Sequence, residues 1–177
     1  MTLQLGDSAP DFKLPGVDGK TCSLSAFQES KVLVVIFSCN HCPYVKAYED
    51  RMVQIQKDYQ DRKVQFVLIN SNEDINYPED SFENMVRCAK EKGYPFPYLR
   101  DASQGTARSY GATHTPHLFV FDAERQLRYT GKIDDNTQYP GAVKRPYLRE
   151  ALEDLLAGRP VREAETHAIG CTIKWKR

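Results

Sequence analysis

The 177-residue sequence has no excess of either charge and no long apolar run. Its 24 basic and 24 acidic residues are interspersed, so no basic patch that would bind nucleic acid or a membrane surface is expected. The first seven residues lack the basic and apolar regions of a secretion signal, and no apolar run is long enough to span a bilayer. These absences predict a cytoplasmic protein with no nucleic-acid partner and no membrane partner.

Internal repeats, low-complexity tracts and linkers are lacking as well. A chain of this length can bury a full core in one domain, and we predict a single domain over residues 1–177. The five cysteines are an odd number, which argues against a framework of structural disulfides. In a reducing compartment they are expected to be free or catalytic.

Two of the cysteines lie in one motif, S-C-N-H-C-P at residues 38–43. The motif follows an apolar run, residues 32–37, and precedes an amphipathic segment, residues 45–59, so it is predicted to lie where a buried strand gives way to a helix. Free N–H groups and the dipole at a helix N-terminus favour a thiolate. Cysteines with this spacing can form a reversible disulfide. We predict a redox pair in which the outer cysteine, Cys39, has the lowered pKa and Cys42 closes the disulfide.

A second pair of metal ligands is missing from the sequence. A structural zinc site built on C-x-x-C needs another C-x-x-C or two spaced histidines, and the remaining three cysteines stand alone. We therefore expect no metal and no cofactor. One metal-based alternative stays open, a metal-binding carrier that uses Cys39, Cys42 and a loop histidine such as His114.

The hydrophobic pattern predicts an α/β fold with a central mixed β-sheet flanked by helices, an N-terminal β-hairpin and a C-terminal tail. A strand, a helix and a second strand follow one another around the motif, and a right-handed crossover makes the two strands parallel. The predicted hairpin spans 11–24, the strands 31–37, 64–69, 118–121 and 124–130, the helices 45–59, 79–92, 103–110 and 146–157, and the tail 161–177.

Two further segments carry chemical information. The polar loop 70–80 follows a predicted parallel strand, where such sheets bind ligands, although a solvated loop is the simpler interpretation. Thr115-Pro116 precedes the strand predicted over 118–121, and a proline is tolerated there because the position needs no N–H. X–Pro bonds are the only ones for which a cis peptide costs little, but most of them are trans.

Four segments together carry a family resemblance. They are G-x-x-A-P-D-F-x-L at 6–14 with D-G-K-x-x-S-L at 18–24, the C-x-x-C motif, Thr115-Pro116, and the tail at 169–175. The segments at 6–14 and 18–24 resemble the N-terminal hairpin of redoxins. The C-x-x-C motif resembles the thioredoxin active site, and Thr115-Pro116 resembles the cis-proline segment that faces that site. The chain thus resembles the redoxin branch of the thioredoxin superfamily, with its membrane-anchored thiol oxidoreductases and peroxiredoxins. The tail is similar to that of a bacterial peroxiredoxin-like group. The resemblance implies a thioredoxin-like fold and a cis Pro116.

The sequence departs from this family pattern at the site. Thioredoxins have a buried acid a few residues before the first cysteine, where this sequence has Leu33, so some other base must serve. Peroxiredoxins have the pattern Pro-x-x-x-Thr-x-x-Cys-Pro. Cys42-Pro43 matches its end, while Val35 and Cys39 replace its proline and threonine.

The predicted function is thiol–disulfide exchange with protein or small-molecule thiols and disulfides. In this prediction Cys39 attacks the substrate and Cys42 resolves the mixed disulfide. The resemblance implies a thioredoxin- or glutathione-type reductant. The alternative is a peroxiredoxin-like peroxidase in which Cys42 attacks peroxide and Cys39 or Cys171 resolves.

Further residues are candidates for the site. His41 lies between the two cysteines, where an imidazole can stabilise the Cys39 thiolate, although a solvent-facing residue is the simpler interpretation. Thr115 and Pro116 would hold a substrate strand against the sulfur atoms. Cys171 is either an inert buried thiol or a resolving cysteine that a docked tail brings to the site.

Overall fold

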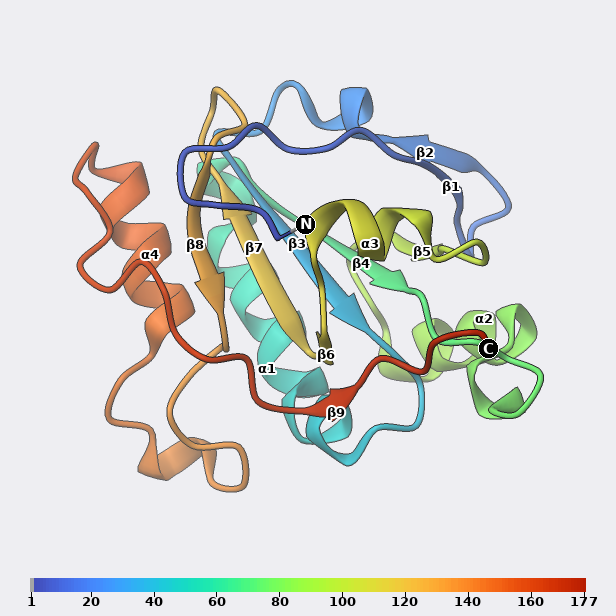
Figure 1. The fold of residues 1–177 in the computed structure, drawn as a ribbon. Helices are drawn as coiled ribbons and strands as arrows, with labels where there is room; N and C mark the ends of the chain where they lie inside the picture. Colours follow the sequence, from blue (N-terminus) through green and yellow to red (C-terminus); the bar gives the residue numbers. More distant parts are fainter. Residues whose placement is uncertain (1) are drawn as a thin grey trace.

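A five-stranded mixed sheet forms the centre of the protein, and the computed structural model describes residues 2–177 (Figure 1). In sheet order the strands are β5 (Tyr98–Arg100), β4 (Val64–Asn70), β3 (Val32–Ser38), β7 (His117–Phe121) and β8 (Leu127–Gly131). β3, β4 and β5 are parallel, and β7 is antiparallel to both of its neighbours. The expected mixed sheet, its parallel central pair and its antiparallel last pair are therefore confirmed.

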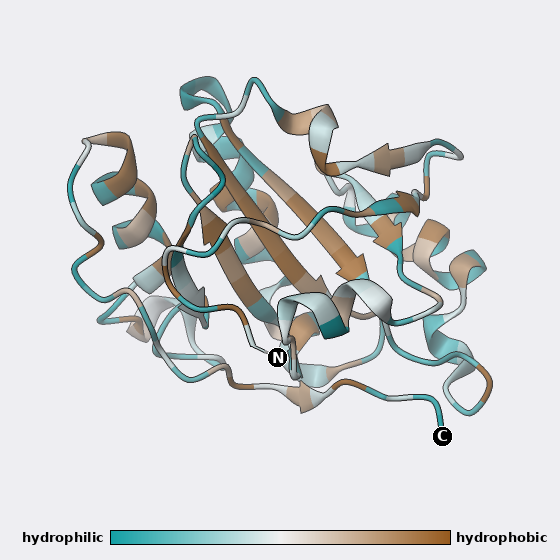
Figure 2. Ribbon diagram, turned by 45° about the horizontal axis from the view of Figure 1, so that its top comes forward, coloured by the Kyte–Doolittle hydropathy of each residue, from teal (hydrophilic) through white to brown (hydrophobic). Residues whose placement is uncertain are grey.

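Four helices cover both faces of this sheet: α1 (Pro43–Tyr59), α2 (Phe82–Lys92), α3 (Gly105–Tyr110) and α4 (Tyr147–Leu156). All seven side chains of β3 are buried because the strand lies in the middle of the sheet. Val34 and Ile36 face a core that includes α1 and α4, whereas Leu33 and Phe37 face a core that includes α3. Burial on both faces explains why residues 32–37 show no alternation, and Figure 2 shows the hydrophobic colour concentrated on the central strands.

The predicted buried stripe of α1 is confirmed, since its residues at spacings of three and four lie in the core: Val45, Tyr48, Met52, Ile55 and Tyr59. A 3₁₀ turn, η2 (Gln60–Arg62), extends the end of α1. Among residues 2–177, no helix is long and apolar enough to cross a membrane.

The N-terminal hairpin is also confirmed. β1 (Lys13–Pro15) pairs antiparallel with β2 (Thr21–Ser23), and Gly19 makes the turn with a positive φ of 82° that favours glycine. A 3₁₀ turn, η1 (Leu24–Phe27), follows the hairpin. The hairpin packs on the same face of the sheet as α3, because Phe12 and Phe27 belong to that core.

The helix predicted over 79–92 begins later than expected. Residues Pro78–Asp80 form a separate 3₁₀ turn, η3, and Ser81 then caps α2 by accepting a hydrogen bond from the Asn84 N–H (3.2 Å). This cap separates Asp80 from the helix. Asp80 therefore stays in the loop at the end of β4, next to the end of β3.

The tail and the segment before β7 form a small sheet of their own. β9 (Cys171–Thr172) pairs antiparallel with β6 (His114–Thr115). Before β9, the tail runs along the edge of β8, where the Thr130 N–H donates to Ala164 O and the Thr166 N–H donates to Thr130 O, both at 3.0 Å. The residues from 134 to 145 are irregular except for a 3₁₀ turn, η4 (Pro140–Ala142).

Candidate active site

The two cysteines of the motif lie between the end of β3 and the start of α1. Cys42 is the N-cap residue of α1, with an extended backbone (φ −65°, ψ 127°), and Pro43 occupies the first helical position, where a missing N–H costs nothing. The Cys42 sulfur makes no capping hydrogen bond of standard geometry. The helix still presents its free N–H groups and dipole to Cys42 rather than to Cys39.

Both thiols are almost completely buried, with an exposed fraction of 1% for Cys39 and 0% for Cys42. Cys39 Sγ lies 3.5 Å from the Thr115 hydroxyl oxygen, and Cys42 Sγ lies 3.4 Å from the Thr115 carbonyl oxygen. The two thiols also interact with each other. All five cysteines are free, so this is the reduced form of the site.

The acidities of the two thiols are opposite to those expected from the sequence. The interaction between them lowers the pKa of Cys42 and raises the pKa of Cys39. Burial raises both pKa values, and the charge of Asp80 raises that of Cys39 further. Cys171 and the Val45 N–H lower the pKa of Cys42. The sequence predicted a lowered pKa for Cys39. In the structure the interaction between the two thiols is the main cause that lowers the pKa of Cys42 instead, and the charge of Asp80 adds to the raised pKa of Cys39.

A buried carboxylate, Asp80, lies beside the cysteines, and no motif in the sequence singled it out. Its oxygens accept hydrogen bonds from the Asn40 N–H (2.7 Å) and from the side-chain amides of Asn70 (3.2 Å) and Asn72 (2.9 Å). These neutral donors satisfy the carboxylate without cancelling its charge. Asp80 is thus a buried carboxylate beside the cysteines, whereas the position of the thioredoxin acid in the sequence is taken by Leu33.

One weak signal in the sequence pointed to this acid. The polar loop 70–80 follows a parallel strand, and the ends of neighbouring parallel strands meet at one edge of the sheet. Tyr98 from the next parallel strand completes the arrangement, since its hydroxyl donates to Asn40 Oδ1 (2.7 Å) and accepts from Asn70 Nδ2 (3.2 Å). Hydrogen bonds therefore make the loop a part of the site, and it is not simply a solvated connection.

His41 is held toward Asp80. Its Nδ1 lies 2.7 Å from Asp80 Oδ2, and its ring stacks on Tyr77 with the ring centroids 5.9 Å apart. The two atoms lie within ion-pair distance, and the contact joins opposite charges only when the imidazole is protonated. The side chain keeps 27% of its surface exposed, so His41 lies between the buried carboxylate and solvent.

The donor set for the metal-carrier alternative differs from the predicted one. Cys39, His41 and Asp80 each offer one ligating atom, and these atoms lie within 4.8 Å of one another. His114 is not among them, and its Nδ1 lies 2.8 Å from Thr113 Oγ1.

Thr115 and the tail complete the site. The Thr115-Pro116 peptide bond is cis, as the resemblance implied. Cys171 lies opposite Thr115 in the pairing of β6 with β9, and its thiol and N–H interact with the Cys42 sulfur. The docking of the tail at the site is thus confirmed, while a resolving role for Cys171 stays a prediction.

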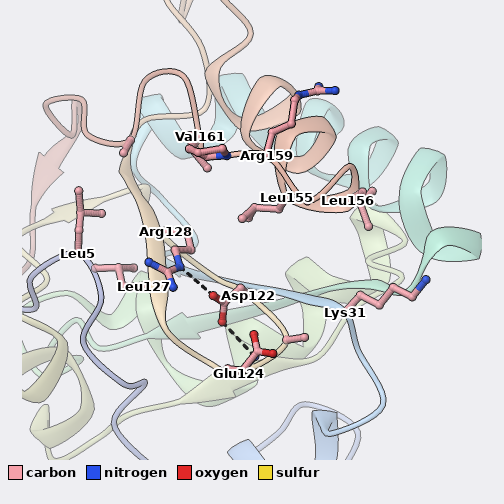
Figure 3. A pocket seen from close by; sticks show the side chains of 14 residues that line it. Leu5, Lys31, Asp122, Glu124, Leu127, Arg128, Leu155, Leu156, Arg159 and Val161 are labelled. Carbon is pink, nitrogen blue, oxygen red and sulfur yellow. Dashed lines mark hydrogen bonds and ion pairs between the residues drawn. The ribbon is translucent and has the colours of Figure 1, made fainter.

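Two surface grooves lie near opposite ends of β3. A groove of about 590 Å³ adjoins the site and is lined by Pro43, Tyr44 and residues 135–138. A groove of about 730 Å³ lies between the β7–β8 hairpin and the end of α4, with Asp122 and Arg128 paired in it at 2.8 Å (Figure 3). The second groove includes Lys31, the residue before β3, so it lies at the far end of the strand from the sulfur atoms.

Comparison with known proteins relates the chain to one family model and to two similar solved structures. The redoxin family model matches residues 4–148. An uncharacterized conserved protein from Geobacillus kaustophilus is 44% identical, with a TM-score of 0.93 over 98% of this chain and 93% of that chain. A hypothetical protein from Sinorhizobium meliloti 1021 is 38% identical, with a TM-score of 0.92 over 99% of this chain and 97% of that chain.

A more distant match shows the fold. The thioredoxin domain of a thiol-disulfide oxidoreductase from Bacteroides vulgatus is 16% identical, with a TM-score of 0.64 over 78% of this chain and 94% of that chain. The fold is therefore thioredoxin-like, as the resemblance implied. Protein FixW from Rhizobium leguminosarum is 24% identical over 140 residues, which are 75% of this chain and 62% of that protein. The chain thus spans less than two thirds of the length of this curated relative.

Proposed function

This chain belongs to the redoxin family, and from that premise we propose that it is a thiol–disulfide oxidoreductase that cycles Cys39 and Cys42 between a dithiol and a disulfide. The family and the structural neighbours support a thioredoxin-like redox function in general. The observation that carries the finer proposal is the meeting of two free, buried thiols at Thr115, with Cys39 Sγ 3.5 Å from its hydroxyl oxygen and Cys42 Sγ 3.4 Å from its carbonyl oxygen. The directions of the two pKa shifts agree with a division of roles between them. One is ready to attack, and the other keeps its proton until it is needed.

The first step belongs to Cys42. Its thiolate attacks one sulfur of a substrate disulfide, the substrate S–S bond breaks, and the other substrate sulfur leaves as a thiolate that takes up a proton. The attack forms a mixed disulfide between Cys42 and the substrate. The lowered pKa of Cys42 supports this order, which reverses the roles expected from the sequence.

The second step belongs to Cys39. Its thiol loses a proton and attacks Cys42 Sγ, which closes the Cys39–Cys42 disulfide and releases the second substrate thiol. The Asp80 and His41 side chains are the bases in reach, because their ligating atoms lie within 4.8 Å of Cys39 Sγ, a distance that one water molecule can bridge. Once Cys42 is in a disulfide, its negative charge no longer opposes ionisation of Cys39.

The choice of substrate is less constrained than the chemistry. We propose protein or small-molecule disulfides as substrates and a thioredoxin- or glutathione-type thiol as reductant. Thr115 lies against both sulfur atoms and belongs with Pro116 to the segment that would hold a substrate strand. The groove beside Pro43 and Tyr44 offers a neighbouring surface for the rest of the substrate. The cytoplasmic location remains a prediction.

A peroxidase is the second candidate, and the position of Cys42 as the N-cap residue before Pro43 supports it. In that reaction the Cys42 thiolate attacks a peroxide oxygen, which forms a sulfenic acid and releases water or an alcohol. The Cys39 or Cys171 thiol then condenses with the sulfenic acid to give a disulfide and water. Peroxide consumption that survives Cys39→Ser but not Cys42→Ser would favour this reaction over thiol–disulfide exchange.

The deciding experiment is the reduction of insulin disulfides by the reduced protein. Cys42→Ser is expected to abolish the activity. The double variant Cys39→Ser, Cys171→Ser, which lacks both thiols next to Cys42, is expected to accumulate a mixed disulfide on Cys42 that mass spectrometry can locate. Cys88→Ser is the matched control, since Cys88 lies on α2 outside the site. Retained activity in Cys42→Ser would refute the proposal. A mixed disulfide found on Cys39 in the Cys42→Ser protein would restore the order of attack expected from the sequence.

A further inference from the structure

The tail segment 169–175 covers the redox site. β9 pairs with β6 so that His114 lies opposite Thr172 and Thr115 lies opposite Cys171. In Figure 1 the red tail passes from the side of α4 beneath the sheet to the side of α2. In the part of the chain that the structure describes, β9 is the only strand that pairs with β6. The tail therefore occupies the backbone edge on which a substrate strand would lie.

Cys171 is the member of the sulfur cluster that reaches solvent. Cys42 Sγ lies 3.4 Å from Thr115 O, and Cys171 is the register partner of Thr115, so Cys171 lies next to Cys42. Cys39 and Cys42 are buried, whereas Cys171 is partly exposed. With the tail in place, a dissolved thiol therefore has better access to Cys171 than to the two buried cysteines.

Gly170 sets how closely the tail approaches β6. A Cβ atom at this position would lie 2.0 Å from Thr115 O and 2.7 Å from Thr115 C, distances that real Cβ atoms essentially never show. Only glycine lets the two backbones come this close. This approach keeps Cys171, the next residue, beside Cys42.

The tail beyond β9 is held by hydrogen bonds to the loop that also carries Asp80. The Lys174 N–H donates to Asn72 Oδ1, and Lys174 O accepts from the Glu73 N–H and from the Gln104 side-chain amide, each at 2.9 Å. Ile173 is buried among the core residues of the α3 face. The tail therefore has a defined position over the site rather than a loose contact.

We propose that Cys171 is a third redox cysteine, which exchanges disulfides with Cys42 and connects the buried Cys39–Cys42 pair to thiols in solution. This inference rests on the proposed function, because it starts from the Cys39–Cys42 disulfide. β9 takes the place of a substrate strand on β6, and Cys171 takes the place of the substrate cysteine. The partner that recycles the protein is then a small-molecule or protein thiol that needs access only to Cys171.

The exchange balances in three steps. The Cys171 thiolate attacks Cys42 Sγ, the Cys39–Cys42 bond breaks, and Cys39 leaves as a thiolate that takes up the proton lost by Cys171. A thiolate from solution attacks Cys171 Sγ, and Cys42 leaves as a thiolate. A second thiolate from solution attacks the sulfur bound to Cys171, which releases the Cys171 thiolate and an external disulfide. Two external thiols are oxidised, and one protein disulfide is reduced.

The charge state of the cluster favours this order. Burial and the neighbouring Cys42 raise the pKa of Cys171 to about 11 in the reduced protein, so its thiol then acts as a hydrogen-bond donor to the Cys42 sulfur. Once Cys42 is part of a disulfide, its negative charge is gone and Cys171 ionises more readily. Cys42 is in turn the better leaving group of the Cys42–Cys171 disulfide, since its pKa is lowered.

The first test is disulfide mapping after oxidation with one equivalent of oxidised glutathione. In Cys39→Ser protein the expected product is a Cys42–Cys171 disulfide with no bound glutathione. The matched control is the same variant with Cys171→Ser added, in which glutathione should stay attached to Cys42 or not react. A stable glutathione adduct on Cys42 in Cys39→Ser protein, with Cys171 still a free thiol, would overturn the inference.

The second test opens the tail without touching a cysteine. Gly170→Ala should push β9 away from Thr115, so that the arrangement in which the tail covers Cys42 is less populated. The rate of Cys42 alkylation by iodoacetamide should then rise at least about tenfold. Gly141→Ala is the matched control, since a Cβ atom there meets nothing within 4 Å. An unchanged alkylation rate in Gly170→Ala would show that the tail does not close the site.

Different results would refute the proposed function and the proposed relay, in which Cys171 passes disulfides between Cys42 and thiols in solution. In Cys171→Ser protein, reduction of the Cys39–Cys42 disulfide by glutathione should slow at least about tenfold, while that disulfide still forms. Wild-type recycling in Cys171→Ser, together with an inactive Cys42→Ser, would refute the relay and leave the proposed function standing. Insulin reduction by Cys42→Ser protein would refute the proposed function itself.

Discussion

Cys42 and Cys88 are both shielded from water, yet their surroundings act on the sulfur in opposite directions. Cys42 is fully buried and has a lowered pKa. Cys88 is only partly buried, but its pKa is raised to about 11. Because the more deeply buried thiol is the more acidic one, burial alone does not set the acidity of a cysteine in this protein.

The surroundings of Cys88 contain a carboxylate and no helix N-terminus. Its Sγ lies 3.5 Å from Glu49 Oε2 and 3.8 Å from the Tyr94 hydroxyl oxygen. Burial is the main cause of the raised pKa, the Tyr94 hydroxyl opposes it, and the charge of Glu49 adds to it. Cys88 is therefore kept as a neutral thiol.

The active site combines both kinds of surroundings within one motif. Asp80 acts on Cys39 as Glu49 acts on Cys88, since each carboxylate raises the pKa of a neighbouring thiol. Cys42 instead meets a thiol donor and the first turn of α1. A dithiol needs one sulfur that attacks and one that stays protonated until the second step, and this pairing of surroundings supplies both.

The largest expected difference between the two regions is the pH dependence of alkylation. In Gly170→Ala protein, the rate at Cys88 should rise about tenfold for each pH unit between about pH 7 and pH 10, because the thiolate fraction rises below the pKa. The rate at Cys42 should stay nearly flat over the same range, because its lowered pKa leaves it ionised. Mass spectrometry of iodoacetamide adducts gives both profiles, and parallel profiles would contradict the assignment.

Removing the carboxylate near Cys39 should have the next largest effect. Asp80→Asn is expected to slow insulin reduction about 100-fold, because the second step loses a base. The same variant should lower the pKa of Cys39, which thiolate absorbance can follow, because the charge that raises it is removed. Asp74→Asn is the matched control, since Asp74 lies in the same loop and is 43% exposed. If the pKa of Cys39 is unchanged in the Asp80→Asn protein, Asp80 has only a structural role.

Burial also holds His117 in its neutral form, which extends the comparison to folding stability. Burial, with a smaller contribution from His114, lowers the pKa of His117 to about 4. The unfolded chain binds a proton below about pH 6.5 while the folded state does not, so the free energy of unfolding should fall by about 2 kcal/mol between pH 6.5 and pH 4. Urea unfolding of wild-type and His117→Gln protein measures this loss. An equal loss in the variant would show that other groups cause it.

The smallest expected effect concerns Cys88 itself. Glu49→Gln should lower the pKa of Cys88 and raise its alkylation rate at neutral pH about threefold, because one of the charges that oppose ionisation is removed while burial remains. The Gln side chain can still accept the hydrogen bond from the Tyr94 hydroxyl, so the packing should persist. A Cys88 rate that stays the same would mean that burial alone sets this pKa.

The local parts of the fold were readable from the sequence. Residues 32–37 and 64–69 are apolar runs because both strands are buried on two faces, and the stripe on α1 repeats because only one of its faces is buried. The motif at 38–43 predicted a dithiol at a strand–helix junction because the pattern of a buried strand precedes it and the pattern of an amphipathic helix follows it. These features depend on neighbours along the chain, which a pattern in the sequence records directly.

The sequence by itself therefore determined the fold class, the strand–helix junction and the pair Cys39 and Cys42. Tertiary structure alone decided which of the two thiols is acidic, which carboxylate lies beside them, and what the tail covers. Asp80 reaches the site because β3 and β4 are parallel neighbours, and Cys171 reaches it through the pairing of β9 with β6. Acidity depends on charges and donors within a few ångströms, and packing brings these together from segments that lie far apart in the chain.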